Sequence, residues 1–141
     1  MAPTSDGRFV YVADYSHGLL RVRVSDGSVV RIADAPGSTS LGCDGIVLHR
    51  GAIVAVQNGV APARVVRFTL DAAGDSIVAV RVLDQQPALA PEPTIGTMVG
   101  NDFVYVATSQ WETHDEAGHQ LPGAPLPFAR LIAVPADGGP R

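Results

Sequence analysis

Two histidines in the C-terminal third of the chain raise the question of a metal site. The segment His114-Asp-Glu-Ala-Gly-His119 has acidic residues between its histidines, and a zinc protease places two histidines four residues apart on one helix face. Here they are five residues apart with Gly118 between them, so that helical geometry fails. Together with Glu112, the segment 112–125 is predicted to be a polar, solvated loop, with a lid over a binding site as the alternative.

Two further segments combine side chains that take part in covalent catalysis. Asp14-Tyr-Ser-His17 contains an acid, a hydroxyl and an imidazole. A catalytic triad needs these groups to converge, whereas neighbours in a hairpin usually point apart, so we predict a turn. Cys43 has no histidine nearby in the sequence, which favours a buried structural thiol over a nucleophile.

Trp111 and Asn58 are candidates for ligand contacts. Trp111 would line a pocket for a sugar or a lactone if its indole were exposed, but we favour the alternative, a packing anchor between sheets. Asn58-Gly59 is most simply a turn pair. The sequence contains no dinucleotide fingerprint, P-loop, Cys-x-x-Cys pair or nucleophile elbow.

The composition describes a folded chain and excludes several classes of partner. Of the 141 residues, 46% are hydrophobic and 17% are charged, unlike a disordered segment. No apolar run approaches the roughly 18 residues of a membrane helix, and no signal peptide is visible. The net charge of −4 argues against a nucleic-acid surface. A single cysteine excludes an internal disulfide and leaves the compartment unknown.

Apolar runs separated by Gly, Pro, Asn or Asp predict short strands throughout the chain. The segment 8–13 is apolar on both faces, so we expect both faces to be buried. Asp26-Gly27 predicts a tight hairpin turn. No stretch of ten residues keeps a helical period, and the fold class is therefore all-β. The predicted strands are residues 8–13, 20–24, 28–33, 45–48, 52–57, 64–70, 76–83, 94–99, 103–108 and 128–134.

An internal repeat organises these strands. Residues 7–14 (GRFVYVAD) and 101–108 (NDFVYVAT) are close copies, and 51–58 (GAIVAVQN) follows the same pattern. A period of roughly 40–50 residues with four strands is typical of β-propeller blades, with a plain antiparallel sandwich as the alternative. The equivalent positions are predicted to be core or blade-interface residues: Phe9, Tyr11, Ile53, Val56, Phe103 and Tyr105.

We therefore predict one domain, a partial β-propeller of three blades at residues 1–40, 41–86 and 87–141. The middle unit has four strands, the first lacks an innermost strand before Arg8, and the last lacks an outer strand after Val134. This fits the C-terminal half of a six-bladed propeller, cut or started at an internal methionine. Half a ring leaves apolar faces and strand edges open, so we expect a self-associating or aggregation-prone chain rather than a stable dimer.

Several segments resemble a known enzyme family. Ser5-Asp-Gly-Arg-Phe-Val-Tyr-Val-Ala-Asp14 is similar to the SPDGRTLYVAD strand of the gluconolactonase and regucalcin (senescence-marker protein) family. The segment 51–68, which ends in VVRF, is similar to the LWVA…GRVVRF pair that follows in that family. Cys43-Asp44-Gly45 stands where the family has Pro-Asp-Gly. Many propellers share the blade motifs, so only this last tripeptide bears on a site.

The resemblance implies a metal-dependent hydrolase of the lactonase type. In the family a divalent metal, usually calcium, lies at the mouth of the central channel, and Asp44 matches one of its ligands. The metal would polarise a lactone carbonyl, and Asp44 would be a ligand and a candidate catalytic proton acceptor. The family's asparagine and glutamate ligands would lie upstream of Met1. One carboxylate cannot hold calcium, so we expect no metal on this chain alone. The alternative for Asp44 is a turn residue.

Three functions remain open from the sequence. The first is a calcium-dependent lactone or ester hydrolase in a full-length parent, with this chain alone inactive. The second is a non-catalytic propeller that binds a small sugar or lactone on the loop face around Asn58, Trp111 and the segment 112–125. The third is an inactive truncated gene product. Upstream glutamate and asparagine ligands would favour the enzyme, and their absence would favour binding.

Overall fold

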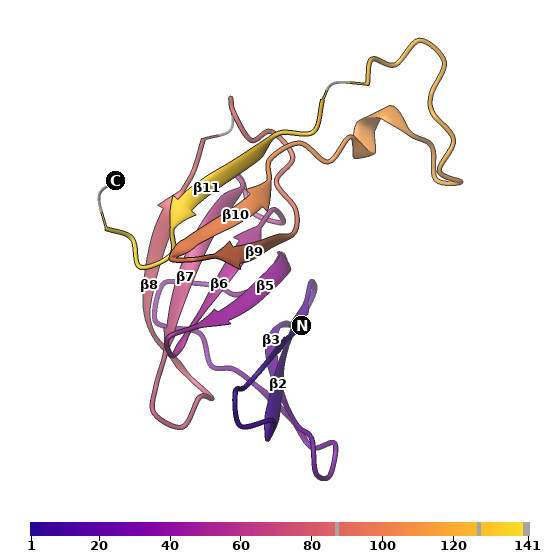
Figure 1. The fold of residues 1–141 in the computed structure, drawn as a ribbon. Coiled ribbons are helices and arrows are strands. Elements are labelled where there is room, and N and C mark those ends of the chain that lie inside the picture. The colour runs from indigo at the N-terminus through magenta and orange to yellow at the C-terminus, as the bar shows by residue number, and fades with distance from the viewer. Residues whose placement is uncertain (87, 127, 140–141) are drawn as a thin grey trace.

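The computed structural model describes residues 1–86, 88–126 and 128–139 and confirms the all-β class. Three antiparallel sheets follow one another along the chain, with four, four and three strands (Figure 1). The first sheet contains β1 (Ala2–Pro3), β2 (Phe9–Asp14), β3 (Gly18–Arg23) and β4 (Val29–Arg31). The middle sheet contains β5 (Cys43–His49), β6 (Ala52–Gln57), β7 (Arg64–Leu70) and β8 (Ile77–Asp84). The third sheet contains β9 (Gly96–Val99), β10 (Asp102–Val106) and β11 (Leu131–Pro135).

Within each sheet, strands that follow one another in the sequence are paired. Short connections join most of these pairs, whereas a long loop joins β10 to β11. The predicted Asp26-Gly27 turn is confirmed: it lies between β3 and β4, and Gly27 has a φ of 70°, which glycine adopts without steric cost. The described residues include one 3-10 turn, η1 (Trp111–Thr113), and no α-helix. None of their helices is long and apolar enough to cross a membrane.

The core lies on both faces of the middle sheet, whose strand β6 is buried at every residue. Ile53 belongs to a cluster that includes Tyr11 of the first sheet. Val54, the next residue along β6, belongs to a second cluster with Phe103 and Tyr105 of the third sheet. Successive side chains of a strand point to opposite faces, so β6 holds the first sheet on one face and the third sheet on the other (Figure 1).

The first sheet corrects two predictions. Ala2–Pro3 forms β1 and pairs with Tyr11 and Val10, so this unit does have a strand before β2. Two residues ending in proline carry no periodic signal, which is why the strand was missed. The expected burial of both faces of β2 is also wrong, because only Tyr11 of its six residues is buried. No described sheet covers the opposite face, where Val12 lies.

Phe9 is the one predicted core residue that is not buried. The guanidinium carbons of Arg8, Arg21 and Arg23 lie 5.8, 4.6 and 5.8 Å from the centre of its ring. Such cation–π contacts cover an aromatic ring without removing it from water. The other predicted core residues are buried: Tyr11, Ile53, Val56, Phe103 and Tyr105.

The third sheet has the three strands predicted for its unit, with shifted ends. Its final strand begins at Leu131 and not at Phe128, which is 99% exposed. Its first strand begins at Gly96, two residues later than predicted. Residues 87, 127 and 140–141 of this unit lie outside the described residues.

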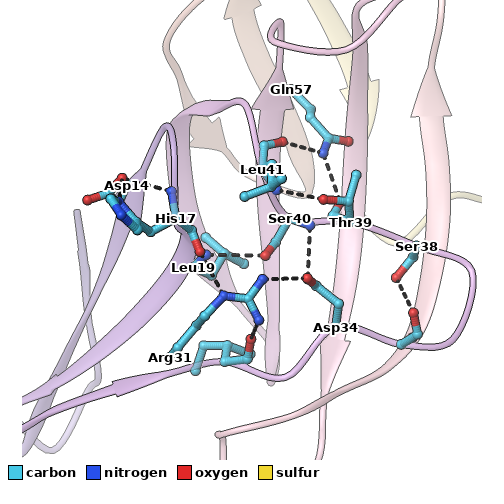
Figure 2. Close-up of polar contacts among 12 residues, drawn as sticks. Asp14, His17, Leu19, Arg31, Asp34, Ser38, Thr39, Ser40, Leu41 and Gln57 are labelled. Carbon is cyan, nitrogen blue, oxygen red and sulfur yellow. Dashed lines mark hydrogen bonds and ion pairs between the residues drawn. The ribbon is translucent and has the colours of Figure 1, made fainter.

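The connection from the first to the middle sheet is fixed at its start by Asp34 (Figure 2). The Asp34 carboxylate accepts hydrogen bonds from Arg31 Nη2 at 2.7 Å and from the Ser40 backbone at 2.9 Å. Ser40 is buried, and its hydroxyl oxygen accepts the Leu19 backbone N–H of β3 at 3.2 Å. The connection is thereby attached to the sheet it leaves.

Gln57 of β6 fixes the far end of the same connection (Figure 2). Its amide nitrogen donates to the carbonyls of Thr39 at 2.8 Å and Leu41 at 2.7 Å. Its carbonyl accepts Arg64 Nε at 2.7 Å. Gln57 is fully buried, and these bonds satisfy its polar atoms, which would otherwise carry a desolvation penalty.

Replacing Phe103 with alanine should lower the free energy of unfolding by about 3–5 kcal/mol, because the ring is fully buried and its loss leaves a cavity. Urea denaturation followed by circular dichroism measures the change. Phe9→Ala is the matched control and should cost less, because that ring is only half-buried. Equal losses for the two variants would contradict the assigned core.

The outer faces of the first and third sheets should cause self-association. Val106 and Leu131 are paired on the face of the third sheet turned away from β6, and Leu131 is 65% exposed; Val29 of the first sheet is 56% exposed. We expect the sedimentation-derived mass to rise with concentration. Leu131→Asp should reduce this rise, whereas Leu126→Asp, in a loop, should not. A monodisperse monomer at all concentrations would contradict the expectation.

Candidate functional site

Asp44 lies at a β-bulge at the start of β5. Asp44 and Gly45 together oppose one residue of β6, because the pairing shifts between Cys43 and Ile46. A bulge of this kind redirects a side chain, and Asp44 is exposed although Cys43 and Gly45 beside it are buried. A Cβ at Gly45 would lie 2.7 Å from the Cα of Ile95. Glycine therefore allows β5 to approach the segment that leads into β9.

This approach brings Asp44 together with two neutral side chains. Asp44 Oδ2 accepts a hydrogen bond from the Thr94 hydroxyl at 2.5 Å and one from Asn58 Nδ2 at 3.2 Å. Asn58 Nδ2 also donates to the carbonyl of Pro93 at 3.0 Å. Asp44 Oδ1 receives no hydrogen bond from the described residues. Among the described residues, hydrogen bonds thus hold one carboxylate oxygen in place and leave the other without a donor.

Asn58-Gly59 lies in the connection between β6 and β7, where a turn pair is expected, but both residues also contact distant segments. Asn58 bridges Asp44 and the segment before β9, so it helps to hold the Asp44 carboxylate in place. Gly59 lies against Gly42, whose Cα would be 2.5 Å from a Cβ at Gly59. The sequence shows neither contact, because both join segments that are far apart along the chain.

Trp111 is not the packing anchor that we expected. It is 74% exposed and begins η1, outside the three sheets. Its position is nevertheless fixed, because Glu92 Oε2 accepts hydrogen bonds from the Ser109 hydroxyl at 2.7 Å and from the Trp111 backbone N–H at 3.2 Å. Gln110 between them has a left-handed backbone with a φ of 67°, which turns the chain sharply.

Asp44 and Trp111 border the same hollow, which we call the Asp44 hollow. Its volume is about 480 Å³, within the range of small-molecule sites. Residues with hydroxyl, amide, carboxylate and indole side chains line it. Its lining residues are Asp44, Thr94, Ile95, Val106, Thr108, Ser109, Gln110, Trp111 and Ala129.

The sequence did not indicate that Glu92 and Thr94 contact Trp111 and Asp44. The only available signal was an acid between two prolines, Pro91-Glu92-Pro93, just before a predicted strand. Such a segment is extended, but its residue types do not indicate that its carboxylate binds the distant backbone of Trp111. Glu92 acts on Trp111 through hydrogen bonds that span a sequence separation of nineteen residues.

The other candidate segments behave as predicted. Asp14 Oδ1 accepts the backbone N–H groups of Ser16 at 3.0 Å and His17 at 2.9 Å and lies 3.0 Å from His17 Nδ1. The hydrogen bonds from the His17 side chain and from the His17 and Ser16 backbones lower the pKa of Asp14. These contacts make a turn, and the Ser16 hydroxyl takes no part in them.

The two histidines of the segment 112–125 have separate partners. His114 Nδ1 lies 2.9 Å from the Thr113 hydroxyl, and His119 Nδ1 lies 3.3 Å from Asp115 Oδ2. The predicted loop is confirmed. Within residues 1–86, 88–126 and 128–139, no group of three or more His, Cys, Asp or Glu is placed to hold a metal ion.

Cys43 is a structural thiol. It is 1% exposed, and burial raises its pKa to about 12. Since the thiolate is the reactive form, a thiol that stays protonated near neutral pH is a poor nucleophile. Its contacts with the cluster around Ile46 and Ile53 instead contribute to the core.

The residues around Asp44 do not fit the calcium site that the family resemblance implied. Calcium takes six to eight oxygen ligands, several of them from carboxylates. Asn58 and Thr94 point hydrogen-bond donors at Asp44, and Asp44 is the one carboxylate in the lining of the Asp44 hollow. The described residues around Asp44 alone therefore do not supply a calcium ligand set.

Comparison with protein-family models, with curated proteins and with solved structures found no match to this chain. The resemblance to the gluconolactonase and regucalcin family therefore stays a prediction from the sequence.

Calcium should leave the melting temperature of this chain unchanged. A ligand present at 100 times its Kd adds about 2.7 kcal/mol to the free energy of unfolding, a shift that differential scanning calorimetry detects. The calcium-free chain in a chelator is the reference, and Asp44→Ala is the control. A rise in melting temperature that Asp44→Ala abolishes would contradict this prediction and restore the metal site.

Removing Glu92 should loosen Trp111. Because Trp111 is the only tryptophan, its fluorescence anisotropy reports this position alone. Glu92→Ala should lower the anisotropy, since both hydrogen bonds to the segment are lost. Glu92→Gln keeps an acceptor oxygen and should restore part of the anisotropy, and Asp26→Ala, in the exposed turn between β3 and β4, is the control. Equal anisotropy in all four proteins would show that Glu92 does not fix the indole.

Proposed function

We propose that this chain is part of a β-propeller that binds a small polyhydroxylated ligand, a sugar or a sugar lactone, in the Asp44 hollow. Three consecutive antiparallel sheets with sequential strand order support the propeller. The first strand of the middle sheet, β5, contacts both β1 and β9, the first strands of the neighbouring sheets. First strands that meet in this way are expected near the axis of a propeller, where ligands enter from the loop face.

The observation that carries the proposed ligand class is that Asp44 and Trp111 border one hollow. A sugar ring has a C–H face and a rim of hydroxyl groups. The electron-rich face of an indole packs against such a C–H face. Asp44 Oδ1 is available to accept a hydroxyl hydrogen, and the hydroxyl groups of Thr94, Thr108 and Ser109 surround the same space.

Hydrolysis of a lactone is the second candidate, and the uncommitted Asp44 Oδ1 favours it. In that reaction Asp44 takes a proton from water as the water oxygen adds to the lactone carbonyl. The ring C–O bond then breaks, and the proton passes to the leaving oxygen to give a hydroxy acid. The described lining contains no cationic side chain to stabilise the negative oxygen that forms. Binding without catalysis is therefore the better supported function.

Asp44→Asn should weaken ligand binding at least tenfold, because a carboxylate acceptor becomes an amide while the shape is kept. Trp111 fluorescence measures the titration, with glucose, galactose and glucono-1,5-lactone as probes. Asp26→Asn removes the same charge from an exposed turn and should bind like the parent. No fluorescence change with any probe would overturn the proposal. Proton release from the lactone that depends on Asp44 would establish the hydrolase instead.

A further inference from the structure

A second hollow adjoins the Asp44 hollow and shares Trp111 with it. This His114 hollow has a volume of about 510 Å³ and is lined by Ser109, Gln110, Trp111, His114, Asp115, Glu116 and Gly118. Ser109, Gln110 and Trp111 line both hollows. Each hollow is large enough for a small-molecule ligand, so the two together exceed what one sugar ring needs.

The wall of the His114 hollow is preformed. Asp115 Oδ1 accepts the backbone N–H groups of Ala117 at 2.9 Å and His119 at 2.8 Å. The Asp115 N–H donates to the His119 carbonyl at 2.9 Å, and the Leu121 N–H donates to the Thr113 carbonyl at 2.8 Å. These bonds close the segment into a small hairpin-like loop beside η1. Binding of a ligand would therefore cost little conformational entropy for ordering this loop.

The charges of the two hollows restrict the ligand. Asp44 borders one, Asp115 and Glu116 border the other, and no arginine lines either among the described residues. The hydrogen bond from the His119 backbone is the largest cause that lowers the pKa of Asp115, so this carboxyl stays ionised near neutral pH. Three carboxylates would repel an anionic ligand, such as a uronate or a sugar phosphate.

From this geometry we infer that the ligand is an uncharged oligosaccharide of at least two sugar units. One unit lies in the Asp44 hollow, the next lies in the His114 hollow, and the indole of Trp111 contacts the ligand at their junction. This inference rests on the proposed sugar binding at Asp44. It adds that the segment 112–125, which the sequence predicted to be a solvated loop, with a lid or part of a ligand-binding loop face as the alternatives, forms a second ligand subsite.

Calorimetric titration of the full chain with glucose, cellobiose, maltose and glucuronate tests the inference. At least one disaccharide should bind tenfold or more tightly than glucose, and glucuronate should bind more weakly than glucose. Glu116→Gln and His114→Ala should each reduce the disaccharide affinity and leave the glucose affinity unchanged. Glu116 is exposed, so its substitution keeps the test valid if His114→Ala does not fold. Asp44→Asn should weaken both kinds of sugar.

The outcomes separate the inference from the proposed function. If glucose binds and depends on Asp44, but neither disaccharide binds more tightly, the second subsite is overturned and the sugar site stands. A gain in disaccharide affinity over glucose that persists in both the Glu116→Gln and His114→Ala variants also overturns the second subsite. If glucuronate binds more tightly than glucose, the proposed exclusion of anionic ligands is overturned. If no sugar binds, the inference and the proposed function both fail.

Discussion

The burial of β6 on both faces is the constraint on which the rest of the structure depends. A strand with apolar side chains on both faces must be covered twice, and the first and third sheets supply the two covers. The positions of these two sheets determine which strand edges meet. Because the third sheet packs on the face of Val54, the segment leading into β9 passes beside the start of β5. Asp44 and Thr94 become neighbours as a consequence of this packing.

Glycine decides how closely these segments approach. Gly45 allows β5 to contact the backbone of Ile95, and Gly42 and Gly59 cross at a similar distance. A side chain at any of these positions would separate the segments by several tenths of an ångström or more. Such a separation would stretch the hydrogen bond between Asn58 and Asp44, already 3.2 Å long, beyond the normal range. The polar site thus depends on residues that themselves carry no polar group.

The sequence predicts the strands much better than it predicts the site. The period-two patterns and apolar runs that produce β2, β6, β7 and β8 are local, and so is the turn at Asp26-Gly27. Burial is not local: Phe9 and Phe103 stand in matching sequences, yet one is half-exposed under arginines and the other is fully buried.

The site depends on contacts between distant segments, which residue types alone do not reveal. Asp44 was identified through its resemblance to a family motif, and Trp111 was named but given the wrong environment. Glu92 was not identified at all, although it accepts a hydrogen bond from the backbone of Trp111. The strands β10 and β11 pair without a break, from Asp102 opposite Pro135 to Val106 opposite Leu131. The Ala107 N–H then donates a hydrogen bond to the Arg130 carbonyl, which closes the base of the loop between the two strands. Substitutions and insertions in that loop can therefore accumulate while the strands on either side keep their register, so sequence divergence is expected in the loop before it affects the fold.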